Sequence, residues 1–77
     1  MKWQDRISIK PNVCHGKACI NGTRVMVSVI LASLADGDSP ETIMENFHLV
    51  PEDLQAAMLF AADMAEDRFL PIEQEVA

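Results

Sequence analysis

The segment from Pro51 to Asp67 is apolar on almost every side of the helix that its sequence predicts. A proline followed by two acidic residues is a typical helix start, because carboxylates in the first turn favour the positive end of the helix dipole. The N-cap position falls on Val50, which has no side-chain acceptor and therefore forgoes about 1 kcal/mol of capping. A helix that is apolar nearly all round must be buried nearly all round. One face comprises Leu54, Ala57, Met58, Ala61 and Ala65, and the other apolar side chains are Leu59, Phe60, Ala62 and Met64.

A chain of 77 residues cannot cover such a helix from all sides by itself. Domains of this size bury roughly 60–65% of the surface of the unfolded chain, so a single small core is only marginally stable. Yet 49% of the residues are hydrophobic, and no apolar run is long enough to cross a membrane. We therefore expect a homodimer without membrane association, in which Leu59, Phe60 and Met64 pack across a two-fold axis.

Two shorter helices are predicted before this segment. The first runs from Val27 to Asp36, and Gly37 is well placed to end it because glycine readily adopts the left-handed conformation. The second begins after Ser39 and Pro40, which match a helix N-cap and a first helical position. The expected core-facing residues are Val27, Ile30, Leu31 and Leu34 in the first helix and Ile43, Met44 and Phe47 in the second.

The residues before the helices predict β structure. Residues 6–10 alternate polar and apolar side chains, which indicates a half-buried strand. Asn21 and Gly22 predict a two-residue type I′ turn that pairs residues 18–20 with residues 23–25 in a hairpin. Since an isolated two-stranded ribbon is marginal in water, the strand at 6–10 is expected to pair with the hairpin of a second copy.

The expected fold class is mainly α with a short N-terminal β-hairpin. One domain covers residues 1–77, with the hairpin region at 5–26, a helical core at 27–67 and a C-terminal tail at 68–77. The residues expected to shape the turns are Gly16, Asn21, Gly22 and Thr23.

The last two predicted helices have the spacing of a helix-turn-helix motif, with a short helix, a brief turn and a longer helix. In that motif the second helix reads bases with side chains near its N-terminus. Here those side chains belong to Glu52, Asp53 and Gln55, and no Lys or Arg occurs from Pro51 to Asp67. The shape fits DNA binding, whereas the acidic side chains would repel phosphates.

The net charge of −6 is unevenly distributed. Residues 1–24 hold five basic residues and one acid, a net of +4, and residues 25–77 hold eleven acids and one Arg, a net of −10. Overall acidity argues against a free-standing nucleic-acid-binding protein, because phosphate neutralisation supplies most non-specific affinity. Two interpretations stay open. In the first, the basic N-terminal hairpin contacts phosphates, and a dimer presents two such hairpins. In the second, the chain is an acidic cytoplasmic protein with a few surface lysines.

Cys14 and Cys19 are too few for a disulfide scaffold. The polar start of the chain does not resemble a signal peptide, so we expect reduced thiols in the cytoplasm.

A zinc site usually needs two ligand pairs, but Cys14 and Cys19 form one C-x₄-C spacing. The adjacent His15 would point away from Cys14 in an extended chain. A nucleophilic cysteine needs a positioned base, and His48 is expected in a distant turn. We therefore expect no metal, no cofactor and no enzymatic activity.

Two successions of residues are distinctive. The first is Asp5-Arg6-Ile7-Ser8, Pro11, Gly16-Lys17, Cys19-Ile20 and Gly22-Thr23-Arg24, and the second is Gly37, Ser39-Pro40-Glu41, Ile43 and Leu49-x-Pro51-Glu52-Asp53-Leu54. Together they closely resemble the small bacterial and archaeal family known as domain of unknown function 433. The resemblance covers about residues 5–62, and its G-K-x-C-I-x-G-T-R core is specific.

The resemblance implies an N-terminal β-hairpin followed by a trihelical, homeodomain-like helix-turn-helix core. Members of the family resemble antitoxins, many of them encoded beside a PIN-like ribonuclease toxin that they are held to sequester. Antitoxins of this kind commonly dimerise and bind their own promoter. The family has no established catalytic set, so no catalytic residue is implied.

We therefore expect an antitoxin-like interaction protein that binds and neutralises a PIN-like ribonuclease toxin and also contacts its own promoter DNA. The alternative is a helix-turn-helix DNA-binding regulator without a toxin. The side chains expected to contact nucleic acid or a protein partner are Lys17, Arg24 and Arg6.

Overall fold

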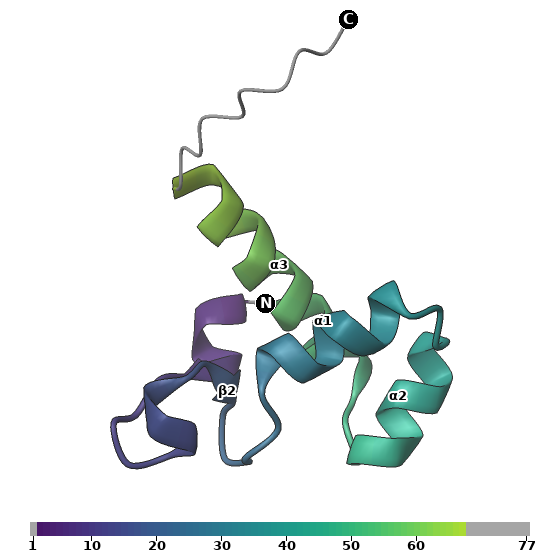
Figure 1. Cartoon of the computed structure of the whole chain (residues 1–77), viewed down its shortest axis with the longest axis horizontal. Helices are drawn as coiled ribbons and strands as arrows, with labels where there is room; N and C mark the ends of the chain where they lie inside the picture. Colours follow the sequence, from purple (N-terminus) through teal and green to yellow (C-terminus); the bar gives the residue numbers. More distant parts are fainter. Residues whose placement is uncertain (1, 68–77) are drawn as a thin grey trace, which may run out of the picture.

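The computed structural model describes residues 2–67, and most of them belong to three α-helices (Figure 1). Helix α1 spans Val27–Ala35, α2 spans Pro40–Phe47 and α3 spans Pro51–Asp67. The last two are joined by the short turn of a helix-turn-helix. The tail expected at 68–77 lies outside the described residues.

The N-terminal third alternates short 3₁₀ helices with short strands. Helix η1 (Trp3–Arg6) leads into strand β1 (Ile7–Ser8), and helix η2 (Cys14–Gly16) leads into strand β2 (Cys19–Ile20). The two strands are antiparallel, with Ile7 opposite Ile20 and Ser8 opposite Cys19. The predicted class, mainly α with a small antiparallel β pairing near the N-terminus, is confirmed. Strand β1 is shorter than predicted, and it pairs with β2 of the same chain.

The core lies where the three helices meet β2. Ile30 and Ile43 are its largest buried residues, with exposed fractions of 0% and 1%. Complete burial of a side chain of this size contributes about 1.5–3 kcal/mol. The other core-facing residues predicted in α1 and α2 are also confirmed, since each is buried or packs half-buried against the core. The buried cluster comprises Ile20, Val27, Ile30, Ile43, Leu49, Leu54 and Ala57.

Helix α3 turns a different face to the core from the one its sequence predicts. Leu54 and Ala57 are buried as expected, but Met58 is 48% exposed and Ala56 is fully buried in its place. The reason is that α3 packs against η1 and β1 as well as against α1 and α2. The buried face is therefore rotated toward the N-terminal segment, and Met58 is left outside it.

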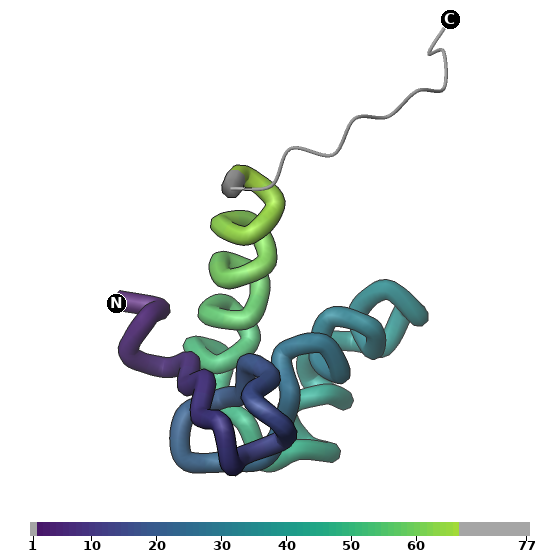
Figure 2. Tube along the Cα trace, turned by 60° about the vertical axis from the view of Figure 1, so that its left-hand side comes forward, coloured from purple at the N-terminus to yellow at the C-terminus, as the bar shows by residue number. Residues whose placement is uncertain are grey.

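The C-terminal half of α3 extends away from the other helices (Figures 1 and 2). Every side chain from Ala62 to Glu66 is exposed. The N-terminal segment lies beside the preceding turns of α3, where the rings of Trp3 and Phe60 meet edge to face with centroids 6.0 Å apart. Within residues 2–67, no helix combines the length and the apolar character needed to span a bilayer.

The turn at Asn21–Gly22 differs from the predicted hairpin. The Thr23 amide donates to the Ile20 carbonyl at 3.0 Å, and of the two central residues only Gly22 has a positive φ, of +82°. These features match a type II turn, since type I′ needs a positive φ at both positions. The Ile20 amide then donates to the Val25 carbonyl at 2.9 Å, so Ile20 faces a residue two positions later than the predicted register requires.

The ends of α1 and α2 follow the predicted capping chemistry. Gly37, with a φ of +96°, follows Asp36, the C-cap of α1, and the amide of Asp38 donates to the Ser33 carbonyl at 3.0 Å. This long bond is characteristic of the Schellman motif. The Ser39 hydroxyl oxygen accepts a hydrogen bond from the Thr42 amide at 3.1 Å and caps α2.

Candidate functional site

Asp53 joins the start of α3 to the N-terminal segment. Its Oδ1 accepts a hydrogen bond from Arg6 Nη1 at 2.8 Å, and its Oδ2 accepts one from the Val50 amide at 3.2 Å. A carboxylate three residues into a helix thus bonds back to the N-cap amide, as in a capping box. This bond satisfies the Val50 amide itself and supplies one of the two bonds of a capping box, while the other bond needs a side-chain acceptor that Val50 lacks. The Asp53 side chain is only 12% exposed, so its charge is compensated where water has little access.

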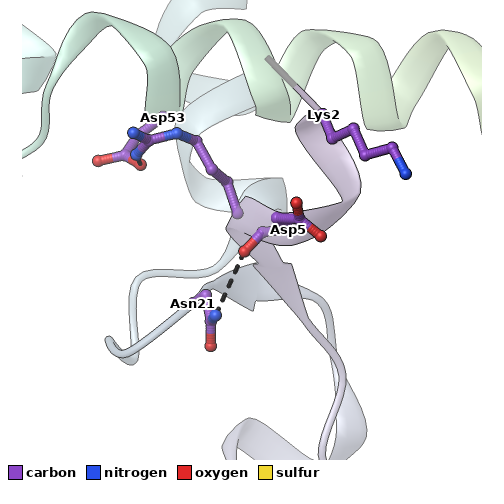
Figure 3. A pocket seen from close by; sticks show the side chains of 5 residues that line it. Lys2, Asp5, Asn21 and Asp53 are labelled. Atoms are coloured by element: carbon purple, nitrogen blue, oxygen red, sulfur yellow. Dashed lines mark hydrogen bonds and ion pairs between the residues drawn. The ribbon is translucent and has the colours of Figure 1, made fainter.

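A polar hollow lies beside this ion pair and is lined by Lys2, Asp5, Arg6, Asn21 and Asp53 (Figure 3). Asn21 Nδ2 donates to the Asp5 carbonyl at 3.3 Å, and the Asn21 amide donates to the Arg6 carbonyl at 2.7 Å. Two cations and two carboxylates line the hollow, and Arg6 and Asp53 are the two that form an ion pair. Among the described residues, no buried side-chain nitrogen or oxygen lacks a partner. The contacts around the hollow therefore hold the N-terminal segment against α3 and β2. They also place Arg6, expected as an outward contact, in an intramolecular ion pair.

A second hollow is basic, and we call it the basic groove. Lys10 and Arg24 are exposed on it, and neither forms an ion pair with any residue that the structure describes. Cations beside hydroxyl groups are the side chains that contact phosphate oxygens in nucleic-acid complexes. The groove is lined by Ser8, Lys10, Val13, Gly22, Thr23 and Arg24.

Local hydrogen bonds hold the Arg24 side of the basic groove. The Thr23 hydroxyl donates to the Ile20 carbonyl at 2.8 Å and accepts from the Val25 amide at 3.0 Å. These two bonds fix the backbone on both sides of Arg24. They also explain why the loop between Ile20 and Val25 is longer than the predicted two-residue turn. Of the predicted turn residues, Thr23 therefore has the largest role in shaping the groove.

Lys17 and Arg24, both expected to contact nucleic acid or a protein partner, line different hollows. Lys17 lies at an apolar hollow formed by Ile9, Ala18, Val27, Ser28, Leu31 and Phe60. The basic groove brings Arg24 together with Lys10, which the sequence pattern marks only as one of the five basic residues of residues 1–24. The register of β1 against β2 leads from Ser8 toward Lys17 and away from the turn, so no local signal in the sequence places Lys10 beside Arg24.

The two cysteines lie close together at the edge of the β pairing. Cys19 is fully buried and Cys14 is half-buried. Burial raises the pKa of the Cys19 thiol, and its hydrogen bond with the Cys14 side chain raises it further. Among the described residues no three metal-binding side chains of His, Cys, Asp or Glu gather in one place.

The predicted dimer residues have two different environments in α3. Leu59 and Met64 are 38% and 37% exposed, on the outer part of the helix. Phe60 differs from the expectation, because its ring packs against Trp3 and against the core of its own chain. Together with the exposed Met58, Leu59 and Met64 leave apolar area on α3 that the described part of the chain does not cover.

Helices α2 and α3 and the turn between α1 and α2 carry exposed side chains of one charge sign, which together we call the acidic surface. Residues 27–67 contain nine acids and no Lys or Arg. Asp53 is buried in its ion pair, whereas the others whose side chains are described are exposed. The acidic surface comprises Asp36, Asp38, Glu41, Glu45, Glu52, Asp63 and Glu66.

Comparison with known proteins identifies a structural relative. A DUF433 member protein from Anabaena variabilis ATCC 29413, whose crystal structure is known, superposes with a TM-score of 0.76 at 34% sequence identity. The match covers 82% of the present chain but 63% of the relative, so this chain spans less than two thirds of that protein's length. No curated protein gives a significant match.

The family model described as a protein of unknown function (DUF433) matches residues 7–61, which include β1, β2, α1, α2 and most of α3. The basic groove, the thiols and the Asp53 ion-pair residue all fall within that range, while Arg6 immediately precedes it. The chain therefore belongs to the DUF433 family.

Proposed function

We propose that this chain is an antitoxin-like, non-enzymatic interaction protein of the cytoplasm that binds and neutralises a PIN-like ribonuclease toxin. The observation that carries the proposal is the acidic surface, which lies on α2, on α3 and on the turn between α1 and α2, in a stretch of 41 residues (27–67) without Lys or Arg. A ribonuclease holds RNA with a basic surface, and complementary potentials accelerate association and select the partner. The acidic surface supplies the charge that such a partner attracts.

We further propose that the functional unit is a homodimer formed through α3. Leu59 and Met64, with exposed fractions of 38% and 37%, are large apolar side chains on a helix half that contacts little else in residues 2–67. Full burial of a Leu or Met side chain contributes about 1.5–3 kcal/mol, so two such residues from each chain favour association. A dimer would also double the acidic surface presented to the toxin.

Copurification tests the toxin proposal. The full chain, with an affinity tag, is expressed with the product of the neighbouring gene, and the two are expected to elute together with the nuclease activity suppressed. Glu41→Lys with Glu45→Lys, on α2, is expected to weaken the complex. Ser28→Ala, an exposed and charge-neutral change on α1, is the control and should bind normally. A neighbour that is neither nuclease-like nor retained would contradict the proposal.

A second candidate function is DNA binding without a toxin, and the basic groove is the observation that favours it. Because Glu52 is exposed at the start of α3, phosphates would be contacted from the groove and not by the second helix of the motif. Lys10 and Arg24, both exposed, are the cations available there.

Band-shift titration on the upstream region of the gene tests this second candidate. Binding is expected to weaken steeply with salt, and each phosphate contact removed by Lys10→Ala or Arg24→Ala should lower the slope of log K against log [salt] by about 0.9. Lys2→Ala removes an equal charge outside the groove and should leave the slope nearly unchanged. Absence of binding at low salt would exclude this candidate.

A further inference from the structure

The loop before β2 turns through three consecutive residues in the left-handed region. The φ angles of Cys14, His15 and Gly16 are +51°, +57° and +80°. L-residues other than glycine rarely adopt this conformation, because Cβ approaches the following carbonyl oxygen. The Lys17 amide donates to the Cys14 carbonyl at 3.1 Å and closes the curl. As a result, Cys14 is turned back toward the strand that follows.

Each of the two sulfur atoms contacts a backbone carbonyl oxygen near this curl. Cys14 Sγ lies 3.5 Å from the Arg24 carbonyl oxygen, and Cys19 Sγ lies 3.5 Å from the Lys17 carbonyl oxygen. Cys19 faces Met26 across a β-bridge, so Arg24 belongs to the segment that runs beside Cys19. Cys14 Sγ touches Arg24 and Cys19 faces Met26, so both thiols lie against the same short segment of the chain.

The two thiols differ in access to solvent. Cys14 is half-buried and can be reached by a small oxidant, whereas Cys19 is fully enclosed. Neither thiol is needed for the core ion pair or for the helix caps described above. An accessible cysteine beside a buried second cysteine is the arrangement found at reversible redox sites, where the second thiol resolves the oxidised first one.

We propose that Cys14 and Cys19 form a reversible redox pair, which a peroxide converts into an intrachain disulfide. In the first step the Cys14 sulfur attacks hydrogen peroxide, so that an S–O bond forms, the O–O bond breaks and water leaves, giving a sulfenic acid. In the second step the Cys19 sulfur attacks the Cys14 sulfur. The S–S bond forms, the S–O bond breaks, and the hydroxyl group leaves with the Cys19 proton as water. Two electrons pass from the sulfur atoms to the peroxide, which is reduced to water.

The disulfide would link the curl to β2 and fix the loop that carries Lys17. Because Cys14 Sγ contacts the carbonyl of Arg24, the link would lie next to the backbone of a residue that lines the basic groove. The redox pair does not depend on the proposed function, since its formation is measured on the isolated chain.

Intact-mass measurement of the full chain tests the proposal. After treatment with hydrogen peroxide at neutral pH, the monomer mass is expected to fall by about 2 Da as two thiol hydrogens are lost. Both cysteines should lose reactivity toward maleimide under denaturing conditions, and dithiothreitol should restore the mass and the reactivity. Proteolytic mapping should recover one cross-linked peptide that contains Cys14 and Cys19.

Two single variants separate the steps. Cys19→Ala is expected to stop at the sulfenic acid, about 16 Da heavier and trapped by dimedone. Cys14→Ser keeps the buried Cys19 and is expected to show neither change at the same peroxide dose. Native-like circular dichroism of both variants confirms that they are folded before the assay. A wild-type chain that gains oxygen atoms without losing 2 Da, or that forms only interchain disulfides, would overturn the proposal.

Discussion

Asp53 is the single residue on which two parts of the molecule depend. Its carboxylate caps the first turn of α3 and neutralises Arg6 from a segment 47 positions earlier in the chain. The sequence suggests the first role, because acids in the first turn of a helix are favourable. It does not suggest the second, because nothing in the local pattern indicates which of five N-terminal cations lies nearby.

Replacement of Asp53 by Ala is expected to lower the free energy of unfolding by about 1–2 kcal/mol, through loss of its hydrogen bond to the Val50 amide and of a partly buried ion pair. Urea denaturation followed by circular dichroism measures the change. Glu52→Ala removes the neighbouring exposed acid and should change the free energy of unfolding by less than about 0.5 kcal/mol. Equal effects of the two substitutions would mean that the carboxylate of Asp53 has no special role.

The Cys19 thiol predicts how stability depends on pH in the alkaline range. Burial raises its pKa above the usual value of 9.0, so the folded chain holds the proton more tightly than the unfolded chain does. This contribution to stability is complete below about pH 9 and is lost as the pH rises toward the folded-state pKa. The free energy of unfolding of the wild-type chain should therefore fall more between about pH 8 and about pH 10 than that of Cys19→Ala, measured in urea. Parallel curves for the two chains would contradict this assignment.

At the scale of elements, the sequence predicts helices better than strands. Gly37 and Ser39 signal helix ends through local conformation and local hydrogen bonds, which depend only on neighbouring residues. The register around Gly22 is set instead by the Thr23 hydroxyl, which competes with the backbone for the same partners. The rotation of α3 depends on η1, whose packing along that helix has no periodic signal in the first six residues.

Replacement of Ser39 by Ala tests the cap of α2. Loss of the hydrogen bond from the Thr42 amide is expected to cost about 1 kcal/mol of unfolding free energy, since that amide has no partner within the helix. Ser28→Ala makes the same chemical change on the exposed side of α1 and should be neutral within about 0.5 kcal/mol. Thermal and urea unfolding of the two variants provide the comparison. A Ser39 variant as stable as the Ser28 variant would show that water replaces the cap at no cost.

At the scale of the whole molecule, the candidate site was only partly predictable. Charge sums located the basic and acidic halves correctly, because exposed charges need no tertiary contact to be counted. They could not show that Arg6 is neutralised by Asp53, nor that Lys10 and not Lys17 lies beside Arg24. Those facts depend on how the N-terminal segment folds back onto β2 and α3.

The homodimer prediction belongs to this scale. Leu59→Glu adds a charge to an exposed apolar position of α3 and is expected to yield a folded monomer, whereas the wild-type chain at micromolar concentration should have twice the monomer mass by light scattering. Asn46→Glu adds the same charge on α2, where the side chain is exposed, and should remain dimeric. Phe60→Ala should instead lower stability, because the ring packs inside the chain. A wild-type chain that is folded and monomeric would exclude the dimer.

The edge-to-face contact between Trp3 and Phe60 joins an early part of the chain to a late one. A ribosome that adds about 5–20 residues per second needs about 3–11 s to make the 57 residues that separate the two rings. During that interval the indole of Trp3 lacks its contact with Phe60. Strand β1 can pair with β2, but it cannot yet pack against α3. Folding during synthesis must therefore finish from the C-terminal side, when α3 packs against the N-terminal segment that was made earlier. Indole fluorescence of stalled nascent chains should accordingly change only after α3 has left the exit tunnel.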